Sequence, residues 1–290
     1  MLTRMSSISV NGVRIGYDLR GSGPTVVFVH AGLTDRRSWE KQLDHFSQDH
    51  RVLSYDSRGH GESELGEGTY SPGRDLLALL DGLDIERAIV VGNSMGGGTA
   101  LEAALLEPHR IESLVVAAPG LPGYQWPQSF IEQVRTRVHS QIDAERRKRY
   151  LEGRGEPGVQ LDRDIAAYVR AHIEWMVAGP RRRADTLDPE VVAGVERMLG
   201  AHLRLTWSTP STARVEPEVD VVNRLAEVTA PVLVVNGRED VPEIQEVGTA
   251  VSQSIAQANR VDLDDCGHLP GLERPERFNE VLTRFLASET

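Results

Sequence analysis

Short runs of mainly apolar residues recur along the chain and alternate with longer segments of helical character. The runs lie at 25–30, 51–56, 88–92, 111–117 and 231–236, and are rich in Val, Ile, Leu and aromatic residues. Polar residues do not alternate with apolar ones inside them, so each run predicts a strand that is buried on both faces, as the strands of parallel sheets are. Helical segments at 75–83 and 95–106 separate the runs. This rhythm predicts an α/β fold with helices on both faces of a mostly parallel central sheet.

The stretch from 121 to 225 interrupts this rhythm. It shows no clear strand, and three amphipathic helical patterns, at 129–150, 162–177 and 189–203, follow one another between turns that contain Gly and Pro. Strand and helix then alternate again up to the C-terminus. We therefore predict a core formed by residues 1–120 and 226–290. Residues 121–225 would form a helical cap, or lid, that is inserted before the strand at 231–236.

Composition argues against several classes of partner. The 290 residues carry a net charge of -11, and an acidic surface repels nucleic-acid phosphates and anionic lipid headgroups. No segment approaches the ~20 apolar residues of a membrane span, and the N-terminus lacks the apolar run of a signal peptide. With Cys266 as the single cysteine, no disulfide can form within the chain. We expect a cytoplasmic monomer or homodimer that acts on a small molecule, without nucleic-acid or membrane partners.

A Gly-x-Ser-x-Gly motif occupies residues 92–96, between the predicted strand at 88–92 and the helix at 95–106. A serine hydroxyl is a weak nucleophile, which needs exposure to substrate and a base within hydrogen-bonding reach. A sharp turn from strand to helix gives the exposure, and glycines are needed where the neighbouring chain leaves no space for a Cβ atom. The N–H groups at the start of the helix favour a developing oxyanion. We therefore predict that Ser94 is a nucleophile and not part of a structural glycine turn.

At this point the sequence resembles the α/β-hydrolase family, and the resemblance covers nearly the whole chain outside the helical insertion. In that family the catalytic residues follow the order serine, acid, histidine. The segment 231–240 is similar to the family's strand followed by Gly-x-x-Asp, and 265–268 is similar to its Gly-His signature. The resemblance implies that Asp240 is the supporting acid. It implies that His268 is the general base, which takes the proton of Ser94 and later delivers it to the leaving group.

An oxyanion hole requires two N–H donors that point at one oxygen. The backbone N–H of Met95, directly after the nucleophile, is the first candidate. In the family the second donor lies in the loop after the strand at 25–30, where many members have His-Gly followed by the donor residue. This chain has Ala31 in place of that Gly, so position implies Gly32 as the donor and leaves Ala31 and Leu33 open.

Several other polar residues are better explained by structure than by chemistry. The segment 56–63 (DSRGHGES) resembles a turn that in the family shapes a loop beside the active site. We therefore expect structural roles for His60 and, in the preceding loop, for His30. Cys266 fits a small filler better than a nucleophile. The basic run 181–183 favours a solvated turn, with contact to an acidic substrate as the alternative.

The resemblance also bears on the substrate. Residues 267–273 are similar to small-ester and enol-lactone hydrolases, whereas 92–97 resembles the elbow of hydrolases that cleave C–C bonds in ring-fission products. The C–C hydrolases usually carry Trp directly after the catalytic histidine, where this chain has Leu269. We therefore expect cleavage of a small hydrophobic ester or lactone through an acyl-enzyme on Ser94. The alternatives are a C–C hydrolase, a non-hydrolytic enzyme (cyclase, lyase or acyl transferase) and a ligand-binding protein.

Apolar residues near the insertion could line a substrate pocket or could simply pack the insertion onto the core. The candidates for the pocket are Leu33, Trp126, Phe130, Trp175, Trp207 and Leu269. Metal-binding motifs such as Cys-x-x-Cys and His-Glu-x-x-His do not occur, nor does a P-loop or a Gly-x-Gly-x-x-Gly in register. We therefore expect neither a metal nor a cofactor.

Overall fold

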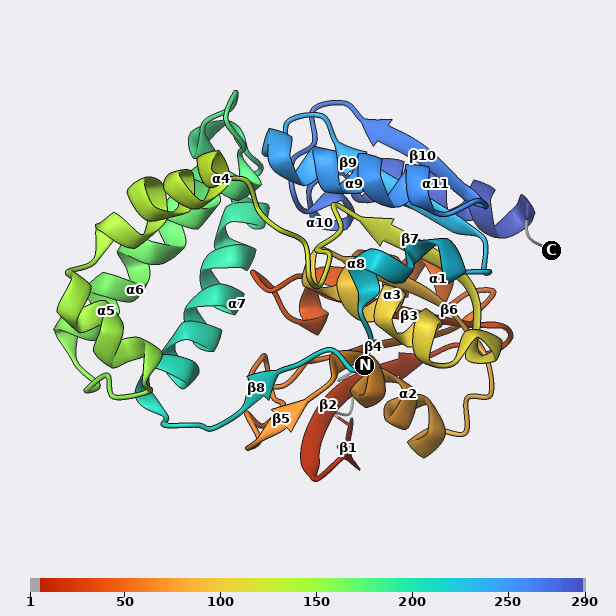
Figure 1. Ribbon diagram of the computed structural model, residues 1–290, viewed down its shortest axis with the longest axis horizontal. Helices are drawn as coiled ribbons and strands as arrows, with labels where there is room; N and C mark the ends of the chain where they lie inside the picture. Colours follow the sequence, from red (N-terminus) through yellow and green to blue (C-terminus); the bar gives the residue numbers. More distant parts are fainter. Residues whose placement is uncertain (1–5, 289–290) are drawn as a thin grey trace.

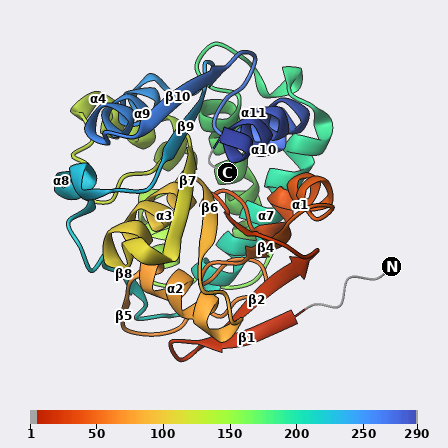
Figure 2. The same cartoon turned by 90° about the vertical axis from the view of Figure 1, so that its right-hand side faces the viewer.

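The computed structural model describes residues 6–288 and is built around one large sheet. Eight strands follow the order β1-β2-β4-β3-β6-β7-β9-β10 (Figures 1 and 2). They span Ser6–Val10 (β1), Val13–Arg20 (β2), Thr25–Val29 (β3), Arg51–Tyr55 (β4), Ala88–Asn93 (β6), Ile111–Ala117 (β7), Val232–Gly237 (β9) and Ala258–Leu263 (β10). The pairs β1–β2 and β2–β4 are antiparallel, and every pair from β4 to β10 is parallel. The predicted α/β fold with a mostly parallel sheet is confirmed.

Helices cover both faces of this sheet. They span Glu40–Phe46 (α1), Pro72–Gly82 (α2), Met95–Leu106 (α3), Pro242–Ser254 (α9), Pro270–Glu273 (α10) and Pro275–Ser288 (α11). Successive residues of β3 point to opposite faces: Val27 and Val29 pack in an apolar cluster with α2, α3 and α9, whereas Val26 and Phe28 pack with α1 and α11. Because both faces of the strand are covered by helices, its sequence shows no alternation of polar and apolar residues.

The segment between β7 and β9 is mainly helical. It contains Gln128–Gln133 (α4), Ala144–Leu151 (α5), Val159–His172 (α6), Pro189–Ser208 (α7) and Val221–Arg224 (α8). In Figure 1 the helices α4 to α7 form a group beside the sheet. Among residues 6–288, no helix has the length and apolar character needed to cross a membrane. The predicted limits of the cap, at residues 121 and 225, stay a prediction.

Two details of this segment differ from the sequence-based expectation. The helix expected at 129–150 is divided, because a π-helical turn (Val134–Val138) and a 3-10 turn (His139–Gln141) follow α4. Asp143 then starts α5 as its N-cap and accepts a hydrogen bond from the N–H of Arg146. A two-residue strand, Arg214–Val215 (β8), also pairs with Thr69–Tyr70 (β5), although no strand was expected here. Such a short exposed strand has no apolar run by which the sequence could reveal it.

Three histidines from distant parts of the chain form a cluster, in which His60 stacks on His202 and His30 is tilted against His60. The ring centroids of His60 and His202 are 3.9 Å apart, and those of His30 and His60 are 4.8 Å apart. His30 and His60 are buried, and His202 of α7 is partly exposed. Burial lowers the pKa of His30 to about 4 and the pKa values of His60 and His202 to about 3. The histidine cluster is therefore neutral at neutral pH.

We expect mild acid to destabilise the protein through these histidines. In the unfolded chain each takes up a proton near pH 6.5, whereas in the folded protein His60 does so only near pH 3. The unfolded state thus binds more protons below pH 6.5, and the free energy of unfolding falls as the pH falls toward the folded pKa. For His60 alone the loss at pH 5 is about 2 kcal/mol relative to pH 7.

Urea unfolding at pH 7, 6 and 5 measures this effect. The variant His60→Asn should show a shallower pH dependence than the wild type, whatever its stability at pH 7. The control is His109→Asn, since His109 is exposed and should leave the dependence unchanged. Equal pH dependence in His60→Asn and the wild type would contradict the prediction.

Candidate active site

Ser94 stands at the sharp turn between β6 and α3. Its backbone has φ 51° and ψ -114°, a strained conformation for a residue other than glycine. The glycines on either side are sterically required: a Cβ atom at Gly92 would lie 2.2 Å from the Gly96 carbonyl oxygen, and one at Gly96 would lie 2.2 Å from the Val29 carbonyl oxygen. The turn therefore packs tightly against β3 and leaves the Ser94 side chain partly exposed.

The structure brings Ser94, His268 and Asp240 together. The Nε2 atom of His268 lies 2.9 Å from the Ser94 hydroxyl oxygen, and its Nδ1 atom lies 2.8 Å from Oδ2 of Asp240. A carboxylate can only accept a hydrogen bond, so Nδ1 carries the proton and Nε2 is left as the acceptor for the serine hydroxyl. The His268 and Asp240 side chains are 2% and 1% exposed, which keeps this contact away from water.

The parallel sheet explains why three distant residues meet. Ser94 follows β6, Asp240 lies in the loop after β9, and His268 lies in the loop after β10. In a parallel sheet the carboxyl ends of the strands lie at one edge, and side chains placed just beyond them converge. The separations in sequence, 174 residues between Ser94 and His268 and 28 between Asp240 and His268, are bridged in this way.

Asn93 joins the turn at Ser94 to the loop that carries His268, a role that sequence reasoning missed. Its side-chain amide donates to the carbonyl oxygens of Ala117 and His268, both at 3.0 Å. The side chain is buried at the end of β6, inside an otherwise apolar strand. A buried polar residue in such a strand is a signal that could have marked it, because buried polar groups require partners.

Glu273 holds the backbone on both sides of His268, and it was also missed. Its carboxylate accepts the N–H of Gly267 and the N–H of Leu269, each at 3.0 Å. The side chain is 2% exposed. Sequence alone offered no specific signal, since Glu273 looks like any acidic residue at the start of the last helices.

Residues expected to be structural make structural contacts. The ring of His30 donates from Nδ1 to the Ala31 carbonyl oxygen at 2.8 Å, and its Nε2 accepts the N–H of Ser57 at 3.0 Å. Both nitrogens are thus occupied, so His30 has none free to act as a second base. Cys266 is fully buried in the apolar cluster with α1 and α11, and burial raises the pKa of its thiol above the usual value.

The candidates for the oxyanion hole lie beside one another. Residues 31–34 form a turn, closed by the N–H of Thr34, which donates to the Ala31 carbonyl oxygen at 2.9 Å. A Cβ atom at Gly32 would lie 3.9 Å from the sulfur of Met95, so the two segments are close. Within residues 6–288, no backbone carbonyl accepts the N–H of Gly32, Leu33 or Met95. These donors are available, and the choice among Ala31, Gly32 and Leu33 stays open.

The six candidates for the substrate pocket fall into two apolar clusters. Trp126, Phe130 and Trp175 form an aromatic row, with centroid distances of 4.2 and 5.3 Å, in a cluster that includes Ala118 and Val241. The remaining three, Leu33, Trp207 and Leu269, belong to a second cluster with residues of α6 and α7. Trp207 packs against two tyrosines of the helical segment, Tyr150 and Tyr168, at 4.9 and 5.2 Å. Whether any of the six contacts a substrate stays a prediction.

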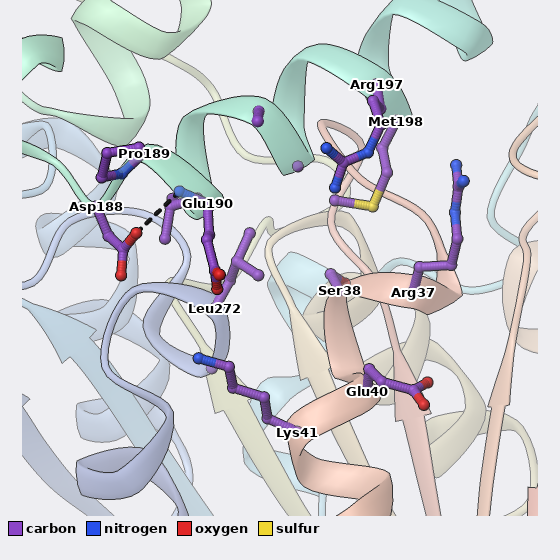
Figure 3. Close-up of a pocket in the computed structure, with 14 residues that line it drawn as sticks. Arg37, Ser38, Glu40, Lys41, Asp188, Pro189, Glu190, Arg197, Met198 and Leu272 are labelled. Atoms are coloured by element: carbon purple, nitrogen blue, oxygen red, sulfur yellow. Dashed lines mark hydrogen bonds between the residues drawn. The ribbon is translucent and has the colours of Figure 1, made fainter.

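A surface groove of about 550 Å³ lies between α7 and the core elements α1 and α10 (Figure 3). Its rim carries charges of both signs, and Met198 and Leu272 add apolar surface. The charged lining residues are Arg37, Glu40, Lys41, Asp188, Glu190 and Arg197. Ser94, Asp240 and His268 do not line it, so the groove follows the junction between helical segment and core apart from these three residues.

Three known proteins are similar to this chain over nearly its whole length. The 3-oxoadipate enol-lactonase 1 of Acinetobacter baylyi is 26% identical over 289 residues, 97% of this chain and 93% of that protein. A 2-hydroxy-6-oxononadienedioate/2-hydroxy-6-oxononatrienedioate hydrolase of Burkholderia vietnamiensis is 30% identical, over 94% of this chain and 91% of that protein. Among solved structures, the enol-lactonase from Burkholderia xenovorans LB400 has a TM-score of 0.71 at 25% identity, and the match covers 97% of this chain and 100% of that one.

The model of the alpha/beta hydrolase family matches residues 26–281. The predicted fold and the predicted resemblance are both confirmed, and so is the prediction of a hydrolase enzyme. The match includes the strand–helix turn at Ser94 and the loops with Asp240 and His268, together with the helical segment between β7 and β9. By this match, which extends over most of its length, the chain belongs to the α/β hydrolase family.

Proposed function

We propose that this hydrolase cleaves a small hydrophobic carboxylic ester or lactone through an acyl-enzyme on Ser94. The observation that carries the proposal is the unbroken series of hydrogen bonds from Ser94 through His268 to Asp240, at 2.9 and 2.8 Å. A buried carboxylate in this position fixes the imidazole tautomer and stabilises the imidazolium that forms during reaction. Binding of a ligand alone does not need such an arrangement.

The reaction proceeds in two halves. The Ser94 oxygen attacks the carbonyl carbon of the substrate while its proton passes to Nε2 of His268, and the resulting oxyanion accepts hydrogen bonds from the N–H of Met95 and of Gly32. His268 then delivers the proton to the alcohol oxygen as the ester bond breaks. In the second half a water molecule gives a proton to His268 and attacks the acyl-enzyme, and His268 returns that proton to the Ser94 oxygen as the acid leaves. With a lactone, acid and alcohol stay in one product molecule.

The surroundings of the triad favour an apolar substrate. Val241, the neighbour of Asp240, belongs to the cluster with the aromatic row of Trp126, Phe130 and Trp175. Leu269, the neighbour of His268, belongs to the other cluster. Apolar side chains thus flank the acid and the base, as expected for a pocket that accepts a hydrophobic acyl or alcohol group. Two of the three similar proteins are named as enol-lactonases, which supports a lactone in particular.

Cleavage of a C–C bond is the second candidate. It is favoured by the relative at 30% identity, which is named as a 2-hydroxy-6-oxononadienedioate/2-hydroxy-6-oxononatrienedioate hydrolase. It is disfavoured by Leu269, which stands where the C–C hydrolases usually have Trp. We therefore place C–O cleavage first.

Replacement of Ser94 by Ala should abolish turnover and leave the fold intact, since the hydroxyl contributes little to packing. The assay is hydrolysis of p-nitrophenyl esters from acetate to octanoate, with circular dichroism to compare the folds. The chain length that gives the highest kcat/KM would measure the size of the acyl pocket. Turnover in Ser94→Ala at the wild-type rate would rule out the acyl-enzyme.

Replacement of Asp240 by Asn should lower kcat on the order of 10⁴-fold, because an amide no longer holds the imidazole in the reactive tautomer. The matched control is Asp264→Asn in the histidine loop, where the Asp264 side chain is 86% exposed and pairs with Arg238. That variant should keep the wild-type kcat. A near-normal rate in Asp240→Asn would mean that another acid supports His268.

Ester or lactone cleavage and C–C cleavage predict opposite substrate preferences, measured as kcat/KM. If the proposal holds, kcat/KM for the best ester or lactone exceeds kcat/KM for 2-hydroxy-6-oxononadienedioate, the compound in the name of the C–C hydrolase relative. Product analysis in ¹⁸O-labelled water adds a second readout, because either hydrolysis incorporates one solvent oxygen into the acid. Products without labelled oxygen would point to a non-hydrolytic enzyme.

A further inference from the structure

Arg182 reaches from the helical segment to the loop that carries His268. It lies in the turn after α6 and the π-helical continuation of that helix, Ile173–Val177. Its Nη1 donates to the Asp265 carbonyl oxygen at 3.0 Å, and its Nη2 donates to the Glu273 carboxylate at 2.7 Å. One side chain thus contacts the histidine loop at two points, three residues before His268 and five residues after it.

The same guanidinium is also hydrogen-bonded to backbone carbonyl groups of the helical segment in which Arg182 lies. Its Nε donates to the Ala178 carbonyl oxygen at 2.8 Å, and its Nη2 also donates to the Val177 carbonyl oxygen at 2.9 Å. With bonds from three nitrogens in two directions, the planar group has one orientation available. Arg182 is therefore a rigid bridge and not a flexible surface cation.

Burial decides how much the contact between Arg182 and Glu273 contributes to holding the histidine loop. The side chains of Arg182 and Glu273 are 15% and 2% exposed. Loss of one partner from a buried pair leaves a charge that is neither paired nor solvated, whereas an exposed pair contributes little. The neighbours in the basic run are of the exposed kind: Arg181, with Glu239, is 63% exposed, and Arg183, with Asp185, is 78% exposed. The expectation of a solvated turn therefore fits the outer two arginines and is wrong for Arg182.

Glu273 links Arg182 to the backbone on both sides of His268. Its carboxylate holds the N–H of Gly267 and of Leu269, the residues before and after His268 in the chain. At Gly267 the loop is in close contact with the helical segment, since a Cβ atom there would lie 2.2 Å from the Val177 carbonyl oxygen and 2.5 Å from Nη2 of Arg182. The backbone of His268 is thus held between Glu273 and the turn that bears Arg182.

We propose that Arg182 is a positioning residue for His268, which acts through Glu273 and makes the geometry of the base depend on the helical segment between β7 and β9. The inference rests on the proposed roles of Ser94 and His268. Arg182 holds the Glu273 carboxylate, and Glu273 holds the two N–H groups that fix the histidine backbone. Without the guanidinium, only the two N–H groups hold the buried carboxylate, and His268 loses its alignment with Ser94.

The test compares Arg182→Met with Arg183→Met, two neighbouring arginines of which one faces the loop. The first readout is the second-order rate constant for labelling of Ser94 by a fluorophosphonate, which needs no knowledge of the substrate. We expect Arg182→Met to be labelled about tenfold to a hundredfold more slowly than the wild type. On the best p-nitrophenyl ester, kcat should fall by a similar factor while KM changes less than twofold. Arg183→Met should match the wild type in both assays.

A second variant, Glu273→Gln, changes the partner of Arg182 in the same contact. In Glu273→Gln the amide can accept from one N–H but turns its NH₂ group toward the other, so labelling should slow again. The double variant should be no slower than the slower single variant, because both changes break one pathway. Circular dichroism and the Tm of each variant establish that it is folded when it is labelled.

Labelling of folded Arg182→Met at the wild-type rate would overturn the inference. If Arg182→Met does not fold, Arg182→Gln carries the test, because its neutral amide removes the positive charge opposite Glu273 and stays polar. Slower labelling of Arg182→Gln supports the inference, and the wild-type rate overturns it. A folded wild-type protein that is not labelled at all contradicts the proposed function itself, whatever Arg182 does.

Discussion

Helix α3 begins so close to the sheet that a Cβ atom at Gly96 would overlap the Val29 carbonyl oxygen of β3. This steric contact forces the chain into a turn at the end of β6, with Ser94 at a positive φ. Since β3 and β6 are neighbours in the sheet, the loop after β3 comes to lie beside the serine, with its free N–H groups. The exposed position of Ser94, the proposed nucleophile, and the place of the candidate oxyanion donors both follow from this one close backbone approach.

Around the turn at Ser94, hydrogen bonds from buried polar side chains hold the backbone of the neighbouring loops in place. Asn93 ties the end of β6 to the histidine loop, Glu273 holds the backbone of that loop, and His30 holds the chain on the opposite side. All three are buried, so each has to be satisfied by protein partners. An unpaired buried donor or acceptor costs about 1–3 kcal/mol, which makes such networks stable only when they are complete. The arrangement of Ser94, His268 and Asp240 is thus set by hydrogen bonds whose directions are fixed, with apolar packing as their support.

The elements that could be predicted from sequence are those with a local signal. Apolar runs predict the buried strands. Short motifs at strand ends predict the roles of Ser94, Asp240 and His268. β10 gives a weaker signal because it lies at the edge of the sheet and most of its residues are partly exposed. Glu273 and Arg182 could not be found, since their contact joins residues 91 positions apart and depends on how the helical segment packs. The division of the helix expected at 129–150 also escaped prediction, because amphipathic periodicity runs through the π-helical turn.

The bridge from Arg182 to Glu273 limits how this protein can exchange parts with its relatives. A helical segment between core strands looks like an interchangeable module, whose replacement would change specificity and spare the catalytic machinery. Here the module supplies the cation for a buried carboxylate of the core, and Gly179 lets its turn lie directly against the Glu239 backbone beside Asp240. A transplanted segment would have to bring both features to its new core. Recombination within the family should therefore succeed most often when the breakpoints keep the turn at 179–182 together with the loops it contacts.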